Sequence, residues 1–348
     1  MNKDYIIPNN WSIIEEGWHP ENVTASESLF SIGNGAMGQR ANFEEDYSGE
    51  TFQGSYIGGI YYPDKTRVGW WKNGYPEYFA KVLNAPNWIG IHIKINHTTL
   101  DLNMCKVSNF KRELNMKEGW LARSFNATLP SGEIIEVNAK RIISLTYNEI
   151  GAIKYAIKAV NFSGKITFSP YIDAGIINED ANYDEYFWEI LDIKETDNEA
   201  SILSKTLKTE YHVATSMLNT FSINNQEVTP KKETKTEAKK ITFTYQLDIN
   251  EGDVATIYKY ASYTTSLNYK NEALIKASIA NVQKSSVLGF KTLLNEQAEA
   301  WENIWRTADI QIEGDIKAQQ GIRFNIFQLN QTYLGTDARL NIGPKGFT

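Results

Sequence analysis

The sequence predicts a mainly β protein, built on a large antiparallel β-sandwich that is followed by helices. From about residue 28 to residue 265, apolar residues alternate with polar ones, which is typical of strands with one face on a core. Polar turn clusters separate these runs, and no helical pattern interrupts them. Around residue 270 the apolar period changes to that of a helix. This order favours a sandwich followed by a helical region.

The clearest strand is residues 89–96, Ile-Gly-Ile-His-Ile-Lys-Ile-Asn, in which the odd positions are apolar. One face of such a strand packs on a core and the other faces solvent. Similar runs occur at residues 133–137, 152–157, 165–171 and 241–245. Turn clusters lie at residues 130–132, 161–164 and 248–252, a spacing that indicates consecutive antiparallel strands.

The first helix after the strands has one apolar stripe. Its members recur at helical spacing: Leu294, Ala298, Trp301 and Trp305. Acidic residues lie on the opposite side of this helix.

The second helix is predicted at residues 316–333, with Asp315 as its N-cap. One apolar stripe consists of Ile322, Ile326, Leu329 and Tyr333, and Phe324 and Phe327 lie beside it. A helix that is apolar on more than one side needs neighbours around most of its circumference. Only 15 residues follow Tyr333, too few for another helix hairpin, so we expect these neighbours to lie outside this chain.

Gly33-Asn-Gly35-Ala-Met-Gly38 satisfies the G-x-G-x-x-G pattern of dinucleotide-binding sites. That mechanism needs a helix opening at the third glycine and an acidic residue about 20 positions later. Residues 40–49 have a poor helical pattern, and the expected acidic position falls within Tyr56-Ile-Gly-Gly59. A glycine-rich turn that joins two strands is therefore the better prediction.

Composition argues against several classes of function. The 348 residues carry a net charge of −7, so the sequence indicates no basic surface for nucleic acid or an anionic membrane. The N-terminal residues lack the apolar region of a signal peptide, and no apolar run is long enough to span a membrane. The single cysteine, Cys105, cannot form an internal disulfide. We therefore expect a cytoplasmic protein.

Candidates for catalysis are few. The four histidines are His19, His92, His97 and His212. They are scattered along the chain and lack the spacing of metal ligands, so no metal site is predicted. Cys105 has no nearby histidine, which favours a buried structural thiol over a nucleophile. Carboxylates gather at Asp173 and residues 179–185, where a glycosidase-type acid pair and an acidic surface loop both fit the sequence.

Aromatic residues make up 12% of the chain and gather in two segments, Gly69-Trp-Trp-Lys-Asn-Gly74 and Tyr183-Asp-Glu-Tyr-Phe-Trp188. Flat rings of this kind stack on sugars, on another domain, or over the end of a sandwich. We favour packing between domains.

Four stretches together resemble the amino-terminal portion of glycoside hydrolase family 65, and within it the maltose phosphorylases. They are residues 27–40 (ESLFSIGNGAMGQR), 51–62 (TFQGSYIGGIYY), 321–330 (GIRFNIFQLN) and 340–348 (LNIGPKGFT). The similarity runs over essentially the whole chain and in the family's order. The last two stretches are specific, whereas the glycine turn alone is not.

The resemblance implies a galactose mutarotase-like super-sandwich, a helical linker and an (α/α)6 barrel that carries the active site. On this plan residues 1–268 form the sandwich domain, 269–314 the linker and 315–348 the start of a truncated barrel. The rest of the barrel would need more than about 200 further residues, by analogy with helical repeats.

The family's reaction is inverting phosphorolysis: phosphate attacks the anomeric carbon of an α-glucoside while a glutamic acid protonates the leaving oxygen. Phosphate is then a co-substrate, and no cofactor is implied. The residues that hold the glucose and supply the acid follow the Gly-Phe-Thr loop in the family, so no catalytic residue has a match here. Lys345, Gly346 and Phe347 match a loop at the rim of the sugar site and are the predicted substrate-binding residues.

Two functions are left open. In the first, the chain is the inactive amino-terminal part of a homodimeric phosphorylase of maltose, kojibiose or trehalose, or of a related α-glucoside hydrolase. In the second, it is a stand-alone carbohydrate-binding or assembly module.

Overall fold

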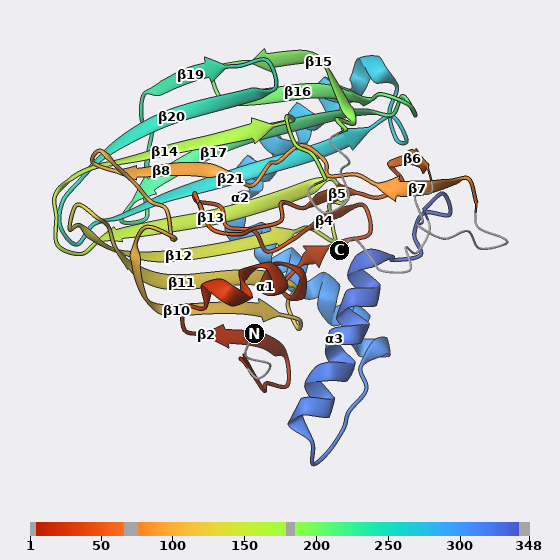
Figure 1. Ribbon diagram of the computed structural model, residues 1–348, viewed down its shortest axis with the longest axis horizontal. Helices are drawn as coiled ribbons and strands as arrows, with labels where there is room; N and C mark the ends of the chain where they lie inside the picture. Colours follow the sequence, from red (N-terminus) through yellow and green to blue (C-terminus); the bar gives the residue numbers. More distant parts are fainter. Residues whose placement is uncertain (1–4, 66–75, 179–184, 341–348) are drawn as a thin grey trace.

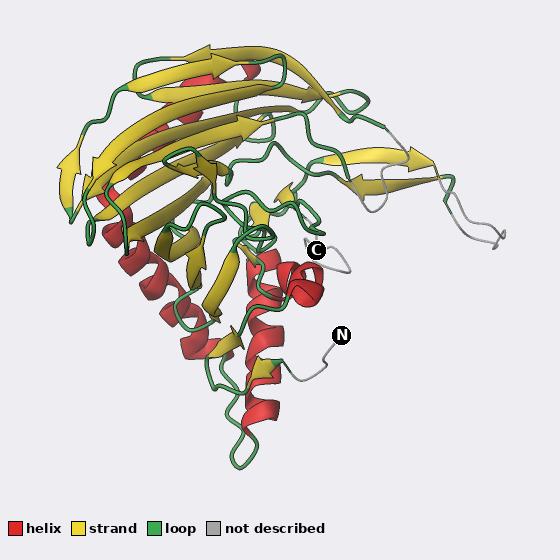
Figure 2. Ribbon diagram, turned by 60° about the vertical axis from the view of Figure 1, so that its left-hand side comes forward, coloured by secondary structure: helices red, strands yellow, loops and turns green. Residues whose placement is uncertain are grey.

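A computed structural model describes residues 5–65, 76–178 and 185–340 (Figure 1). Antiparallel sheets occupy the first part of the chain and two long helices follow them, as the sequence predicts (Figure 2). Among the described residues, no helix is long and apolar enough to span a membrane. The domain boundaries at residues 268 and 314 remain predictions.

The strands are, in chain order, β1 (Ile6–Ile7), β2 (Ser12–Glu16), β3 (Ile32–Gly33), β4 (Met37–Gln39), β5 (Ser55–Ile57), β6 (Tyr61–Lys65), β7 (Tyr78–Val82), β8 (Ile91–Ile95), β9 (Thr98–Thr99), β10 (Lys106–Asn115), β11 (Trp120–Thr128), β12 (Ile134–Ile143), β13 (Ile150–Ala159), β14 (Gly164–Asp173), β15 (Trp188–Glu195), β16 (Glu199–Thr206), β17 (His212–Ile223), β18 (Gln226–Val228), β19 (Lys232–Thr236), β20 (Lys240–Ile249) and β21 (Val254–Thr265). The α-helices are α1 (Val23–Leu29), α2 (Leu274–Ala308) and α3 (Ile316–Thr332), and short 3₁₀ turns lie at Pro20–Asn22 and Asn271–Ala273.

Eleven strands of the described chain form one large antiparallel sheet, in the order β1-β2-β10-β11-β12-β13-β21-β17-β16-β15, with β18 paired to β17. A second sheet, in the order β19-β20-β14-β8-β9, packs against β16, β17 and β21. Alternate side chains point between the two sheets, among them Ile93, Ile166 and Ile257, which are fully buried. The two sheets are the predicted sandwich.

The segment from α1 to β5 lies over the inner face of β11, β12 and β13 (Figure 1). Its own small sheet, β3-β4-β5, contributes Ile32, Met37 and Ile57 to the main core. The inner face of the large sheet is therefore covered partly by the second sheet and partly by this N-terminal segment.

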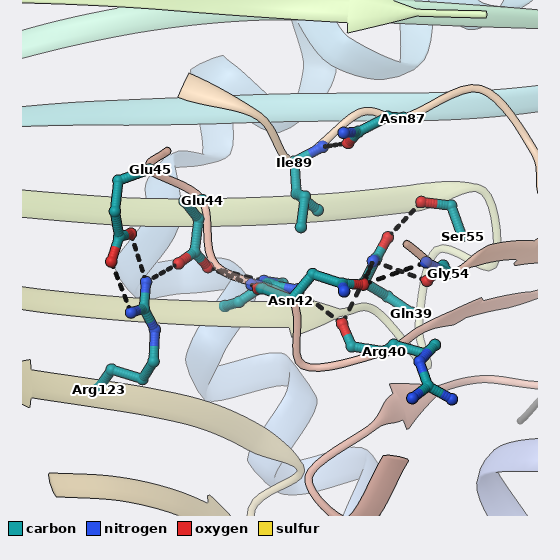
Figure 3. Close-up of polar contacts among 11 residues, drawn as sticks. Gln39, Arg40, Asn42, Glu44, Glu45, Gly54, Ser55, Asn87, Ile89 and Arg123 are labelled. Atoms are coloured by element: carbon teal, nitrogen blue, oxygen red, sulfur yellow. Dashed lines mark hydrogen bonds and ion pairs between the residues drawn. The ribbon is translucent and has the colours of Figure 1, made fainter. Parts of the chain in front are cut away.

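Buried ion pairs attach the N-terminal segment to the large sheet. Arg123 on β11 donates to both Glu44 and Glu45, and its bond from Nη1 to Glu45 is 2.7 Å long (Figure 3). Arg141 on β12 donates to Glu44 and, at 2.6 Å, to the carbonyl of Asn42. All four charged groups are at most 5% exposed. Burying charges is costly unless they are paired, so this loop is held where its carboxylates meet the guanidinium groups.

The long helix α2 lies across the outer face of the large sheet, opposite the N-terminal segment (Figures 1 and 2). It breaks at Gly289, whose φ of 77° and ψ of 155° are not helical. Trp301 and Trp305 of the predicted stripe are buried.

The rest of the predicted stripe on α2 is half-buried: Leu294 packs against the core under α2, and Ala298 is half-buried. Leu293 and Gln297, which the sequence did not single out, are buried. The physical reason is that the Gln297 amide is satisfied inside the fold: it donates to the carbonyl of Gly119 at 3.0 Å and accepts from the amide of Leu145 at 2.8 Å. A polar residue with both partners can occupy a buried position.

We predict that Glu44→Gln lowers the free energy of unfolding at pH 7 by about 3–5 kcal/mol, because two buried guanidinium groups lose their shared carboxylate. Burial acts to raise the pKa of Glu44, but Arg141 and Arg123 outweigh it and lower the pKa from 4.5 to about 2. A lowered pKa stabilises the fold above pH 4.5, and this stabilisation is lost as the pH falls toward 2. The difference in unfolding free energy between wild type and variant should therefore shrink across that window.

Urea unfolding at several pH values measures this difference. Glu233→Gln on β19, where Glu233 is exposed, is the matched control and should change stability by less than about 0.5 kcal/mol. A stability difference for Glu44→Gln that stays constant down to pH 2.5 would contradict the assignment.

Candidate functional site

The stretches that resemble family 65 lie far apart in the sequence but meet around the C-terminal end of α3. The glycine turn after β3 and the Gly58-Gly59 turn after β5 both contact the chain between Gln331 and Leu340. The candidate site is this junction, because the chain leads directly from it to the predicted sugar-binding residues.

The glycine-rich segment Gly33–Gly38 is a turn between antiparallel β3 and β4, which confirms the prediction of a strand-to-strand turn. Asn34 at its centre is buried and uses both ends of its side chain. Its amide oxygen accepts from the backbone of Ala36 and Met37, at 3.0 and 2.8 Å. Its amide nitrogen donates to the carbonyls of Ser144 and Asn148, at 2.6 and 2.9 Å. The turn is therefore fastened to the connection between β12 and β13.

Four glycines, Gly33, Gly35, Gly58 and Gly59, surround the end of α3, and we call them the glycine cradle. The amide of Gly35 donates to the carbonyl of Gln331 at 2.7 Å. A Cβ on Gly58 would lie 2.5 Å from the carbonyl oxygen of Gly35, and one on Gly33 would lie 3.0 Å from that of Gln331. At these positions the absence of a side chain allows backbones to approach closely.

After α3 the chain is held by Arg339. Its guanidinium donates to Asp337, to the carbonyl of Leu267 and, at 2.6 Å, to the side chain of Asn268. The hydrogen bonds from Arg339 lower the pKa of Asp337 to about 2, so this carboxylate is ionised at neutral pH. A cavity of about 80 Å³ lies between this segment and the glycine cradle, and Glu149 is part of its lining.

Helix α3 begins as predicted, with the Asp315 side chain accepting from the amide of Ala318 at 3.0 Å. It packs on the sandwich through polar side chains as well as through Phe327. Gln320 donates to the carbonyls of Ile7 and Ser12, at 3.0 and 2.8 Å. Arg323 donates to the carbonyl of Asn10 at 3.0 Å and forms an ion pair with Asp309.

Of the apolar stripe predicted on α3, only Leu329 is open, at 62% exposed. Ile322, Ile326 and Tyr333 are half-buried, and Ile326 packs against the main core. Phe327, which lies beside the stripe, is buried with its ring stacked on Trp301 at 4.4 Å. The described chain therefore covers the stripe in part and leaves Leu329 open.

The predicted substrate-binding residues, Lys345, Gly346 and Phe347, lie outside the described residues, as do the Trp70-Trp71 segment and residues 179–184. Of the second aromatic segment, Tyr186 is exposed, but Phe187 and Trp188 are buried in the sandwich core. The indole of Trp188 donates to the carbonyl of Asn84 at 2.7 Å. Packing between domains is thus wrong for these two rings, because the strand that starts at Trp188 turns them into the core of their own domain.

The scattered polar candidates form no catalytic group with one another. His92 binds Asp46 at 2.5 Å and Lys240 at 3.1 Å, and Lys240 also lies 3.8 Å from Asp173. Burial raises the pKa of the half-buried Cys105, which disfavours a reactive thiolate. Among the described residues, no three potential metal ligands lie close enough to hold an ion.

Sequence reasoning missed Glu44, Glu45, Arg123 and Arg141. Residues 40–49 had been interpreted only as a poor helix. One signal was available: Arg123 and Arg141 occupy inward-facing positions of alternating strands, between buried neighbours. An arginine at such a position requires a buried carboxylate elsewhere in the chain.

The profile of "Glycosyl hydrolase family 65, N-terminal domain" matches residues 13–304. The chain belongs to glycoside hydrolase family 65. It is 39% identical to "Maltose phosphorylase" of Bacillus subtilis (strain 168) over 98% of this chain. It is 32% identical to "Alpha,alpha-trehalose phosphorylase" of Thermoanaerobacter brockii over 97% of this chain.

Among solved structures, "Putative kojibiose phosphorylase from human microbiome" superposes on this family 65 chain with a TM-score of 0.89 and 25% identity, over 100% of the chain. The chain spans 44% of the maltose phosphorylase, 45% of the trehalose phosphorylase and 45% of the superposed structure. The similarity thus includes the sandwich, the cradle and both long helices of this chain.

We predict that Gly58→Ala lowers the free energy of unfolding by about 1–3 kcal/mol, because the new methyl group would overlap the Gly35 carbonyl. Amide hydrogen exchange should become faster in residues 331–340, which the cradle holds. The matched control is Gly321→Ala on α3, where a Cβ would meet nothing within 4 Å. That change should stabilise the chain by about 0.5–1 kcal/mol. Faster exchange that is confined to β3–β5 would show that the cradle does not hold this segment.

Proposed function

We propose that this chain is the amino-terminal part of an inverting disaccharide phosphorylase that converts maltose and phosphate to glucose and β-glucose 1-phosphate. The observation that carries the proposal is the 39% identity to a maltose phosphorylase over 98% of the chain. The identity to a trehalose phosphorylase is 32%, and that to a kojibiose phosphorylase of Halothermothrix orenii is 26%. Maltose is therefore the disaccharide we favour.

In this reaction the phosphate replaces the water of an inverting hydrolase. It attacks the anomeric carbon from the face opposite the leaving group, while a carboxylic acid protonates the departing oxygen. The part proposed for these 348 residues is structural. The cradle and Arg339 hold the chain as it enters the segment with Lys345, Gly346 and Phe347, which would form the rim of the sugar site.

The surface of α3 supports an origin in a helical barrel. A helix that packs only on the sandwich should be apolar toward the sandwich and polar toward solvent. In α3 the polar side chains Gln320 and Arg323 face the sandwich together with the buried Phe327, and Leu329 is open. An open leucine on this helix fits the first helix of a barrel whose other helices cover it.

The sugar-binding module, the homodimer and the cytoplasmic location are secondary proposals. A stand-alone sugar-binding module was motivated by Trp70, Trp71 and Trp188, and burial of Trp188 removes one of these rings. Calorimetry with millimolar maltose should give no heat if the module hypothesis is wrong. A homodimeric assembly and a cytoplasmic location remain predictions.

We expect the purified 348-residue chain to show no phosphate-dependent cleavage of maltose, because the resemblance matches none of its residues to the family's general acid. An assay for β-glucose 1-phosphate measures this directly. Release of that product by the pure chain would overturn the proposed structural role.

We also predict that two substitutions on α3 differ strongly in their effect on the free energy of unfolding. Phe327→Ala should lower the free energy of unfolding by about 3–5 kcal/mol, because it leaves a cavity beside Trp301. Leu329→Gln should change it by less than about 0.5 kcal/mol and reduce binding of a hydrophobic dye, since it removes exposed apolar surface. Urea unfolding and dye fluorescence of the 348-residue chain test both. A large destabilisation by Leu329→Gln would mean that the sandwich itself covers this stripe.

A further inference from the structure

A second hollow of the molecule lies on the side of the large sheet that faces α2. It is a groove of about 500 Å³ beside the break at Gly289. Its floor consists of small side chains from adjacent strands, among them Ala122 on β11 and Ala156 on β13, and its wall contains Phe290 and Leu294 of α2. The groove shares no lining residue with the cavity at the glycine cradle.

Four lysines line this groove: Lys111, Lys140, Lys154 and Lys291. Its one carboxylate, Glu113, is 3.1 Å from Lys111 and neutralises that lysine. Arg123 also contributes to the lining, but its guanidinium group is bound by Glu44 and Glu45 on the inner side of the sheet.

The remaining three lysines are Lys140, Lys154 and Lys291. None of them has an ion-pair partner within the described part of the chain. Lys140 lies over the ring of Trp120, 3.8 Å from its centroid. Burial lowers the pKa of Lys140, two glutamates oppose this change, and Lys154 acts in the same direction as burial. In a chain with a net charge of −7, three ammonium groups without an ion pair among the described residues therefore border one groove with an apolar wall.

We propose that this groove binds a small organic phosphate, with the phosphate dianion between Lys140, Lys154 and Lys291 and an apolar or ring-shaped body against Phe290 and Leu294. The volume is within the range of about 300–1,000 Å³ that is usual for small-molecule sites. Lysine ammonium groups bind phosphate as point charges, and a dianion needs more than one of them. The proposal does not depend on the phosphorylase function, because the groove lies on the opposite side of the large sheet from the N-terminal segment that carries the cradle.

The probe is phenyl phosphate, titrated calorimetrically into the 348-residue chain at low ionic strength. We expect a dissociation constant below about 1 mM. Inorganic phosphate should bind several-fold more weakly, because it has no ring to contact Phe290, and benzyl alcohol should give no heat. Raising the salt to 0.5 M should weaken the binding of phenyl phosphate, because screening acts on exposed charges.

The double variant Lys154→Gln/Lys291→Gln should weaken phenyl phosphate binding at least tenfold. The matched control is Lys158→Gln, because Lys158 lies four residues beyond Lys154, on the same face of β13, and is not part of the groove lining. It should change the affinity by less than twofold. Thermal unfolding checks that each variant is folded.

Three results would overturn the proposal. They are no heat with millimolar phenyl phosphate, equal affinities for phenyl phosphate and inorganic phosphate, and equal losses from the double variant and from Lys158→Gln. The last two would indicate an adventitious ion only, attracted by surface charge.

Discussion

The buried pairing of Arg123 and Arg141 with Glu44 and Glu45 is the interaction on which the rest of the structure depends. The two arginines point from the large sheet into the interior, where an unpaired charge would be very costly. Among the described residues, the carboxylates that pair with them come from the loop after β4 alone. The N-terminal segment is thereby required over the sheet, and the glycine turns that flank this loop on either side are held with it.

The glycine cradle links the N-terminal segment to the residues at the end of α3. Gly35 and Gly58 lie on either side of the loop with Glu44. Gly58 lets the Gly35 turn approach it closely, and Gly35 in turn contacts the end of α3 and the residues after it. Stretches near both ends of the chain thus share one junction, which gives a physical reason for their joint resemblance to the family. The role we propose for this chain is then that of a support that holds the residues from the end of α3 to Leu340.

Some elements were predictable because their signals are local. The alternation in Ile91–Ile95 and the N-cap at Asp315 depend only on neighbouring residues, and both are present as predicted. Phe187 and Trp188 were misassigned because their partners lie far away in the sequence, in the sandwich core. The burial of Gln297 was missed for the same reason, since its partners are Gly119 and Leu145. The candidate site was predictable only through the resemblance, since Asn34 binds carbonyls that are more than 100 residues away.

The sequence by itself determined the fold class, the order of strands before helices and the membership of family 65. These follow from apolar periodicity and from local motifs, which do not require knowledge of any distant contact. Tertiary structure alone decided which face of α3 packs inward, which charges are buried together and where the lysine groove lies. The physical reason is that burial depends on partners: Gln320 and Arg323 are buried because carbonyls and Asp309 meet them there, and Leu329 is open because no described residue covers it.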